Sequence, residues 1–346
     1  MTRQKRFHVL GVVAAVTVCL FLQIATVQAQ STIYLAGAGS SLVATVFSAW
    51  TNDFNRKNTA IQAGYFPLNS AEAINQIKAH SADFGDGEIP LTPQQIHDAK
   101  VPLIEIPILL VGIVPIYNVP GNPELRFSGK LLADIYLGSI TSWSDPRIEK
   151  MNPGVRLPDL RIQVIHRTQG SGTNYIFSDF LSKASPEFRT RVGKSPSPNW
   201  PAGKAATSSV NALEIVKSSA GAIAYVDLSF AVRSNMTYGS VQNSTGKFIK
   251  ATPEAIASAC VAKESLIATD FGASLADAPA TDAYPVVGFN FAYVRSSGLS
   301  AERTRALKQF LSWALGDGQQ MAPGLGYTPL PPNIATRAEA KLMSIQ

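Results

Sequence analysis

The chain has 346 residues, which is enough for two domains that each bury a core, and 46% of its residues are hydrophobic. Its formal net charge is +6, but three of the 30 basic residues lie in the first six positions, and no basic stripe favours nucleic acid. The modest positive excess that remains suits an anionic ligand without requiring one.

Residues 1–29 are typical of a cleavable secretory signal peptide. Basic residues at 3–6 precede an apolar run at 9–24, and Val-Gln-Ala at 27–29 offers small residues for cleavage. We therefore expect an exported, periplasmic protein that begins near Gln30 and has no membrane span in its mature chain.

Strand-like and helix-like segments alternate along the mature chain. The run at 33–36 favours a strand and the segment 62–65 is expected to be extended, and each precedes a polar turn and a helix, at 43–55 and 71–79. A third strand leads into an acidic turn near Glu88. This alternation predicts an α/β fold with mixed, largely parallel sheets, in which ligands bind at the carboxyl ends of strands.

Two long apolar segments, 104–116 and 284–293, are expected to be buried strands that pass between lobes. They predict a hinge and a cleft, with a discontinuous first lobe (30–112 and 287–346) and an inserted second lobe (113–286). Further strands are expected at 161–165 and 222–226, helices at 132–137, 212–217, 252–267 and after Ser300, and a loop at 324–331.

The segment 166–174, His-Arg-Thr-Gln-Gly-Ser-Gly-Thr-Asn, lies between a predicted strand and a predicted helix. Such a turn points free backbone N–H groups out of the strand end, while Ser171 and Thr173 add hydroxyl groups and Arg167 adds a positive fork. The pattern favours a site for a small oxyanion. The simpler interpretation is an ordinary capped helix with Arg167 in solvent.

Other chemistry is poorly supported. As a nucleophile, Ser171 would need a base, but His166 precedes it on a strand whose neighbouring residues point to opposite faces, and Gly-x-Ser-x-Gly is absent. His80 and His97 have no ligand-like spacing to a third residue, and Cys260 is the only cysteine of the mature chain. We therefore expect no enzyme, no metal and no organic cofactor.

The motifs, taken in order, resemble the extracytoplasmic phosphate-binding proteins of phosphate ABC importers. The resemblance spans roughly residues 33–331. Its landmarks are Gly-Ala-Gly-Ser-Ser at 37–41, Ser70, Asp-Phe-Gly at 83–85, Pro-Leu at 90–91, 132–138, Trp143, Asn-Pro at 152–153, Arg167 with Gly-Ser-Gly-Thr at 170–173, 221–225 and 326–331.

The resemblance implies a two-lobed periplasmic-binding-protein-like (type II) fold with flanking helices and a hinge cleft. Such a protein would be a monomer that captures inorganic phosphate and delivers it to an ABC permease at the inner membrane. By position, the implied phosphate-binding residues are Ser41, Leu42 through its backbone, Ser70, Glu88, Arg167, Ser171, Gly172 and Thr173.

This sequence departs from the family pattern at several of these positions. Ser41-Leu42 stands where Thr-Phe is common, Ala-Glu-Ala at 71–73 replaces glycines, Glu88 replaces an aspartate, and Gln169 replaces an aspartate two residues after the arginine. Arg167 is therefore expected to lack a carboxylate partner, which leaves the cleft more positive.

The expected preference for phosphate over sulfate depends on Glu88. An ionised carboxylate only accepts hydrogen bonds, so it suits phosphate, which keeps a proton near neutral pH, and disfavours sulfate, which has none. The simpler interpretation of Glu88 is a solvated turn carboxylate. The alternative functions are an exported phosphate scavenger or sensor without a permease, and a binder of another tetrahedral oxyanion such as arsenate or sulfate.

Overall fold

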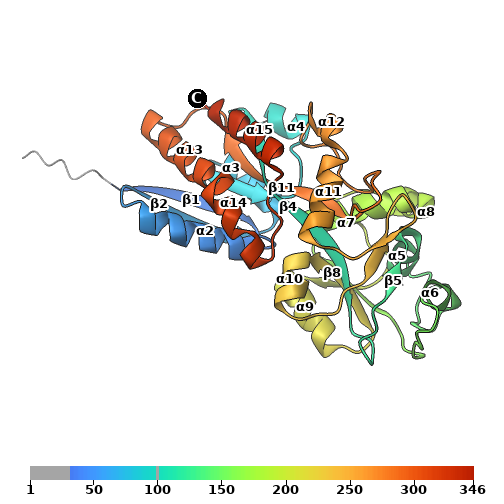
Figure 1. Ribbon diagram of the computed structural model, residues 1–346. Coiled ribbons are helices and arrows are strands. Elements are labelled where there is room, and N and C mark those ends of the chain that lie inside the picture. The colour runs from blue at the N-terminus through green and yellow to red at the C-terminus, as the bar shows by residue number, and fades with distance from the viewer. Residues whose placement is uncertain (1–31, 99–100) are drawn as a thin grey trace, which may run out of the picture.

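The fold is described from a computed structural model that covers residues 32–98 and 101–346 (Figure 1). The expected signal peptide lies outside these described residues. Within the two described ranges, no helix has the length and apolar character needed to span a membrane.

One mixed sheet runs through the molecule in the order β2-β1-β3-β11-β4-β8-β6-β7, and a small sheet has the order β10-β9-β5. The strands are β1 (Ile33–Ser40), β2 (Ile61–Leu68), β3 (Phe84–Gly87), β4 (Leu103–Tyr117), β5 (Arg126–Phe127), β6 (Gln163–Arg167), β7 (Lys204–Ala206), β8 (Ala222–Asp227), β9 (Ser240–Gln242), β10 (Phe248–Ile249) and β11 (Val287–Arg295).

Helices flank the large sheet. They are α2 (Ala44–Lys57), α3 (Ser70–Lys78), α4 (Pro93–Asp98), α5 (Gly129–Tyr136), α6 (Pro146–Met151), α7 (Gly172–Ala184), α8 (Pro186–Arg191), α9 (Ser209–Ser218), α10 (Leu228–Arg233), α11 (Pro253–Val261), α12 (Glu264–Ile267), α13 (Ala301–Leu315), α14 (Asp317–Met321), the 3-10 turn η1 (Pro323–Leu325) and α15 (Pro332–Met343).

The long strand β4 joins the two ends of the sheet. From Leu103 to Gly112 it pairs with β11, and from Ile113 to Tyr117 it pairs with β8, both antiparallel. β1 is parallel to β2 and β3, while β6 is parallel to β7 and β8. These directions make the carboxyl ends of the two parallel sets face each other across the middle of β4, where ligand sites of α/β sheets form.

Figure 1 shows α2, α3 and α13–α15 gathered around β1 and β2, and α5–α10 gathered around β8, with β4 and β11 between the two groups. We call these groups, with their strands, the first lobe and the second lobe. The large aromatic residues Trp50, Trp143 and Phe310 are fully buried in the core. The α/β fold class with two lobes is therefore confirmed.

The first strand is longer than the sequence indicates. The expectation placed a turn at 37–41, but β1 continues through both glycines to Ser40. Gly37 lies under the ring of Phe84 and Gly39 lies against Asp86, at points where an added methyl group would approach those residues to 2.0 and 2.5 Å. The glycines thus permit close strand packing rather than a turn.

One expectation about helices was wrong, and one helix was missed. The helix expected at 252–267 is two helices, α11 and α12, and α15 follows the expected tail loop. α15 was missed because its buried residues, Ile334, Ala338 and Leu342, form only a narrow stripe with a spacing of four.

Candidate functional site

The centre of the site is the carboxyl group of Glu88, which directly follows β3 and is 2% exposed. Its Oε2 accepts hydrogen bonds from the hydroxyl groups of Ser40 (3.0 Å) and Ser70 (2.8 Å), and its Oε1 accepts one from Asn290 Nδ2 (3.1 Å). Burial raises the pKa of Glu88, whereas these hydrogen bonds and the attraction of Arg167 lower it. Glu88 is therefore not a solvated turn residue.

The strand and helix ends explain why two serines meet at this carboxyl group. Ser40 is the last residue of β1, which runs parallel to β3, and Ser70 is the first residue of α3. Asn69 caps α3 by accepting a hydrogen bond from the backbone N–H of Glu72. The hydroxyl group of Ser70 is thus left to face Glu88.

The start of α7, from the second lobe, lies directly on Glu88. A methyl group added to Gly172 would stand 2.0 Å from Glu88 Oε2 and 2.6 Å from Ser70 Oγ. Nearby, the backbone N–H of Ala71 donates to the carbonyl of Gly170 at 3.1 Å. The two lobes are therefore in contact around the carboxyl group, and only glycine at position 172 permits this approach.

Arg167, the last residue of β6, is 4% exposed. Its Nη1 donates to Ser209 Oγ (2.9 Å), and its other nitrogens donate to the carbonyls of Ala206 and Thr207. No ion pair among the described residues includes Arg167, as the exposed Gln169 at the usual aspartate position suggested. Burial lowers the pKa of the guanidinium group, while Tyr225 and Glu88 raise it. The interpretation that Arg167 is solvated is thus wrong.

Ser171 and Thr173, beside Gly172, are also buried. Ser171 is the N-cap of α7, but its side chain makes no capping hydrogen bond. Asn174 fixes the turn instead: its amide donates to the carbonyls of Thr168 (2.9 Å) and Pro196 (3.2 Å). The first turn of α7 is held by residues other than the two hydroxyl side chains.

Ser41 and Leu42 lie at the entrance to α2. Ser41 is partly exposed and its backbone N–H donates to the carbonyl of Leu68, whereas the backbone N–H of Leu42 is 3.3 Å from Ser40 Oγ. The hydroxyl group that reaches Glu88 is therefore that of Ser40, which the sequence analysis missed because it placed a turn there.

Asp86 and Asn290 were also missed. Both are fully buried, and Asn290 Nδ2 donates to Asp86 Oδ1 as well as to Glu88 Oε1, at 3.1 Å each. An acidic residue two positions before Glu88 could have signalled Asp86, since residues two apart in extended backbone share a face. Asn290 lies 202 residues from Glu88 in the sequence, and no local pattern indicates it.

The arrangement gives no support to a serine nucleophile. His166 is stacked on Trp200 and its Nδ1 lies 3.1 Å from the carbonyl of Arg167, and no hydrogen bond within the described residues links it to Ser171. The described part of the chain also contains no group of three or more His, Cys, Asp or Glu residues suited to a metal ion.

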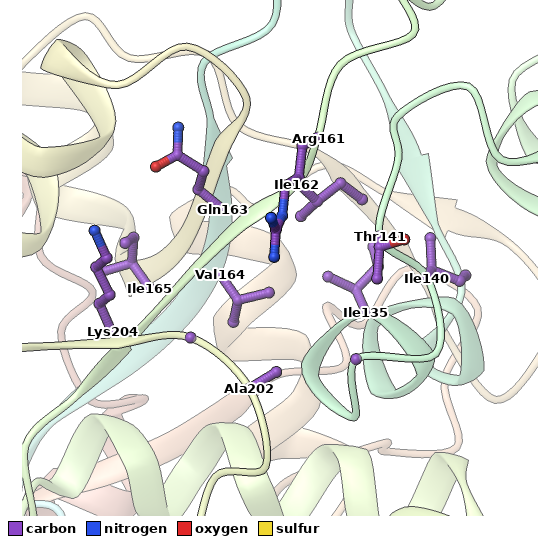
Figure 2. Close-up of a pocket in the computed structure, with 12 residues that line it drawn as sticks. Ile135, Ile140, Thr141, Arg161, Ile162, Gln163, Val164, Ile165, Ala202 and Lys204 are labelled. Atoms are coloured by element: carbon purple, nitrogen blue, oxygen red, sulfur yellow. The ribbon is translucent and has the colours of Figure 1, made fainter.

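Two cavities differ in their relation to the site. One of about 20 Å³, lined by Glu88, Tyr175, Lys194 and Ser274 among others, touches Glu88 but has the volume of about one water molecule. Another of about 450 Å³ lies in the second lobe (Figure 2), between Ile135–Thr141 and the β6 side, with the exposed Arg161 and Lys204 lining it. The larger cavity shares no residue with the site around Glu88.

Comparison with known proteins agrees with this architecture. A model of the PBP superfamily domain matches residues 26–317. The phosphate-binding protein PstS of Xylella fastidiosa (strain 9a5c) is 36% identical over 310 residues, which cover 88% of this chain and 84% of that protein. The PstS of Pasteurella multocida (strain Pm70) is 31% identical over 318 residues, which cover 91% of each chain.

A solved structure of similar fold is that of a putative phosphate ABC transporter substrate-binding protein with bound phosphate from Clostridium perfringens. It has a TM-score of 0.63 and 21% identity, and the match covers 86% of this chain and all of that one. At this identity the likeness concerns the fold alone. The family model and the PstS relatives go further, and the chain therefore belongs to the PBP superfamily and, within it, to the family of PstS phosphate-binding proteins.

Proposed function

We propose that the chain is an extracytoplasmic solute-binding protein that captures inorganic phosphate between its lobes and delivers it to an ABC importer. The observation that carries this proposal is the surrounding of Glu88, a buried carboxyl group that meets two serine hydroxyls and the start of a helix from the other lobe. The PstS relatives are named as phosphate-binding proteins, which supports the same ligand.

The proposed site has donors on both lobes and one acceptor. Ser41, the backbone of Leu42 and Ser70 would donate from the first lobe, beside the N-termini of α2 and α3. From the second lobe, Ser171, Gly172 and Thr173 would donate at the N-terminus of α7, and Arg167 would donate from the end of β6. Donors alone would hold any small oxyanion. Glu88 would accept the hydrogen of phosphate, so it would discriminate against sulfate, which would leave a buried acceptor unpaired.

Binding requires the lobes to move. The 20 Å³ cavity at Glu88 is far smaller than a phosphate ion, and Gly172 touches the carboxyl group. We infer that α7 separates from Glu88 to admit the ion and that the lobes then close over it. The division would be 30–112 with 287–346 against 113–286, because β4 changes partner between Gly112 and Ile113.

The remaining parts of the proposal follow from export and transport. The chain would lose residues 1–29 in the periplasm, act as a monomer, and present its closed form to the permease, so ligand binding would select the shape that is recognised. We assign no reaction to it: the ion is bound, buried and released unchanged.

Isothermal titration calorimetry on residues 30–346 tests the ligand, with phosphate, arsenate and sulfate as titrants. We expect binding of phosphate and of arsenate, which is also protonated, and at least about 10⁴-fold weaker binding of sulfate. Small-angle X-ray scattering of the same samples should show a change in molecular dimensions only with the anions that bind. Absence of phosphate binding, or equal affinity for sulfate, contradicts the proposal.

A genetic complementation assay tests delivery. Cells that lack their own phosphate-binding protein but keep the permease should regain uptake of labelled phosphate when they export this chain. Tight binding without restored uptake, in cells that encode the cognate permease, would favour the scavenger or sensor function.

A further inference from the structure

A second buried carboxyl group lies beside Glu88. Asp86 and Glu88 are two positions apart at the end of β3, and one amide nitrogen, Asn290 Nδ2, lies 3.1 Å from an oxygen of each. An amide nitrogen carries two hydrogens, so it can donate one to each carboxyl group. Asn290, which β11 contributes, therefore bridges the pair.

The surroundings of Asp86 and Glu88 are unequal. Glu88 accepts two further hydrogen bonds, from Ser40 and Ser70, and is attracted by Arg167. Asp86 receives no such serine hydroxyl, and no ion pair among the described residues includes it. Its Oδ2 is buried without a hydrogen-bond partner, which costs far more for a carboxylate than for a neutral acid.

The two contacts of the Tyr65 phenol group also favour a protonated Asp86. The phenol oxygen lies 2.9 Å from the carbonyl of Ser40 and 3.2 Å from Asp86 Oδ1, but it has one hydrogen to donate. Because the carbonyl of Ser40 is the closer of the two acceptors, we assign the hydrogen of Tyr65 to it. A protonated Asp86 then donates its own hydrogen to the phenol oxygen, so that both contacts are hydrogen bonds.

We propose that Asp86 is a positioning residue of the anion site, which holds the proton of the Asp86–Glu88 pair, keeps Glu88 as the ionised acceptor, and weakens anion binding when it ionises at high pH. The effect on phosphate rests on the proposed function, whereas the location of the proton does not. Burial and the negative Glu88 raise the pKa of Asp86 well above its ordinary value, in agreement with the geometry.

The titratable groups that face Asp86 set the sign of the effect. They are Glu88 directly after β3, Tyr65 on β2 and Tyr293 on β11, none of which is a cation. Loss of the proton therefore adds an uncompensated negative charge next to Glu88. Because this charge lies beside the anion site, it should reduce the affinity for an anion by about tenfold or more.

The test compares wild type with Asp86→Asn, which keeps the shape of the neutral acid but cannot ionise. Phosphate dissociation constants are measured by calorimetry from about pH 6 to about pH 10, and the wild-type value is divided by that of the variant, because the titration of phosphate itself cancels in this ratio. We expect a ratio near one at the acidic end that rises about tenfold or more at the alkaline end. A flat ratio overturns the effect on binding.

Asp134→Asn is the matched control, because Asp134 is a buried aspartate on α5 that pairs with Lys130 and Arg147. The wild-type phosphate dissociation constant divided by that of Asp134→Asn should stay constant across the pH range. A rise equal to that of Asp86→Asn would overturn the assignment to Asp86.

Carbon-13 NMR of ligand-free protein labelled in its aspartate carboxyl groups tests the location of the proton in the absence of phosphate. One resonance should report a protonated carboxyl group at neutral pH and should be absent in Asp86→Asn. In Glu88→Gln, which removes the neighbouring charge, the same resonance should titrate at lower pH. The shift in Glu88→Gln identifies the resonance even if Asp86→Asn does not fold. An Asp86 that is ionised at neutral pH overturns this inference alone, whereas a wild type that binds no phosphate overturns the proposed function.

Discussion

The Cα atom of Gly172 faces the carboxyl group of Glu88 so closely that one added methyl group would lie 2.0 Å from Glu88 Oε2. Glycine is required here for contact between the lobes rather than for its backbone angles, because Gly172 does not have a positive φ. The two lobes can thus meet at this point only because residue 172 has no side chain.

Gly172→Ala should therefore hinder closure. The added methyl group forces Glu88 away from Ser40 and Ser70, which should cost about 1–3 kcal/mol, or roughly 5- to 150-fold in phosphate affinity. Calorimetry gives the affinity, and scattering should show a smaller change in molecular dimensions on addition of phosphate. Gly64→Ala is the control, because nothing lies within 4 Å of a methyl group at that position. Equal affinities of the two variants would contradict the role of this contact.

Two adjacent serines should have separable roles. Ser40→Ala removes a donor from Glu88 and should raise the pKa of its carboxyl group in the ligand-free protein, because that hydrogen bond stabilises the ionised form. Ser41→Ala should weaken phosphate binding, by about 1 kcal/mol, without moving this pKa. NMR titration of labelled glutamate carboxyl groups distinguishes them, and a shift produced by Ser41→Ala alone would reverse the assignment.

Arg167→Lys should weaken phosphate binding although it keeps the positive charge. The guanidinium group is held by Ser209 and two carbonyls in an orientation that an ammonium group cannot reproduce. We expect a loss of about 1.5–3 kcal/mol in calorimetry, the range for charged hydrogen bonds. Arg303→Lys is the control, since Arg303 pairs with Asp83. A wild-type affinity for Arg167→Lys would show that only charge matters.

Glu105 should give the fold a pH-dependent stability. Glu105 is buried on β4, and burial raises its pKa to about 7 from its ordinary value of 4.5. A folded state that binds the proton more tightly loses stability as the pH rises between these two values, by about 3 kcal/mol in total, and no further above them. The free energy of unfolding should therefore decline across this window in wild type.

Glu105→Gln should remove this decline. Urea unfolding measures the free energy of unfolding of both proteins at about pH 4 and about pH 8. The stability of the variant relative to wild type should increase by about 3 kcal/mol from the lower pH to the higher. Glu187→Gln, at an exposed residue paired with Arg191, should follow the wild-type curve. Parallel curves for Glu105→Gln and wild type would contradict the prediction.

Much of the fold could be predicted from the sequence because its signals are local. The cap at Asn69, the helix after Ser300 and the long apolar strand β4 each depend on residues close in the chain. The end of β1 could not be predicted in this way. Gly37 and Gly39 are typical of a turn, and only the packing of Phe84 and Asp86 against them shows why the strand continues to Ser40.

The candidate site divides in the same manner. Arg167 and Gly172 were identified from one continuous motif, and their burial agrees with a role in the site. Asn290 contacts Glu88 from a strand near the other end of the chain, so its part depends on the sheet order β3-β11-β4. A bridging amide of this kind leaves no periodic signal in a sequence.

The most direct test of the account is the phosphate-to-sulfate affinity ratio of Glu88→Gln, measured by calorimetry beside wild type at neutral pH. Glutamine keeps an acceptor oxygen but can also donate a hydrogen bond and carries no charge. We predict that phosphate binding weakens, sulfate binding improves, and the ratio falls by at least about 100-fold. An unchanged ratio would show that Glu88 does not accept the hydrogen of phosphate, and the central claim would then be wrong.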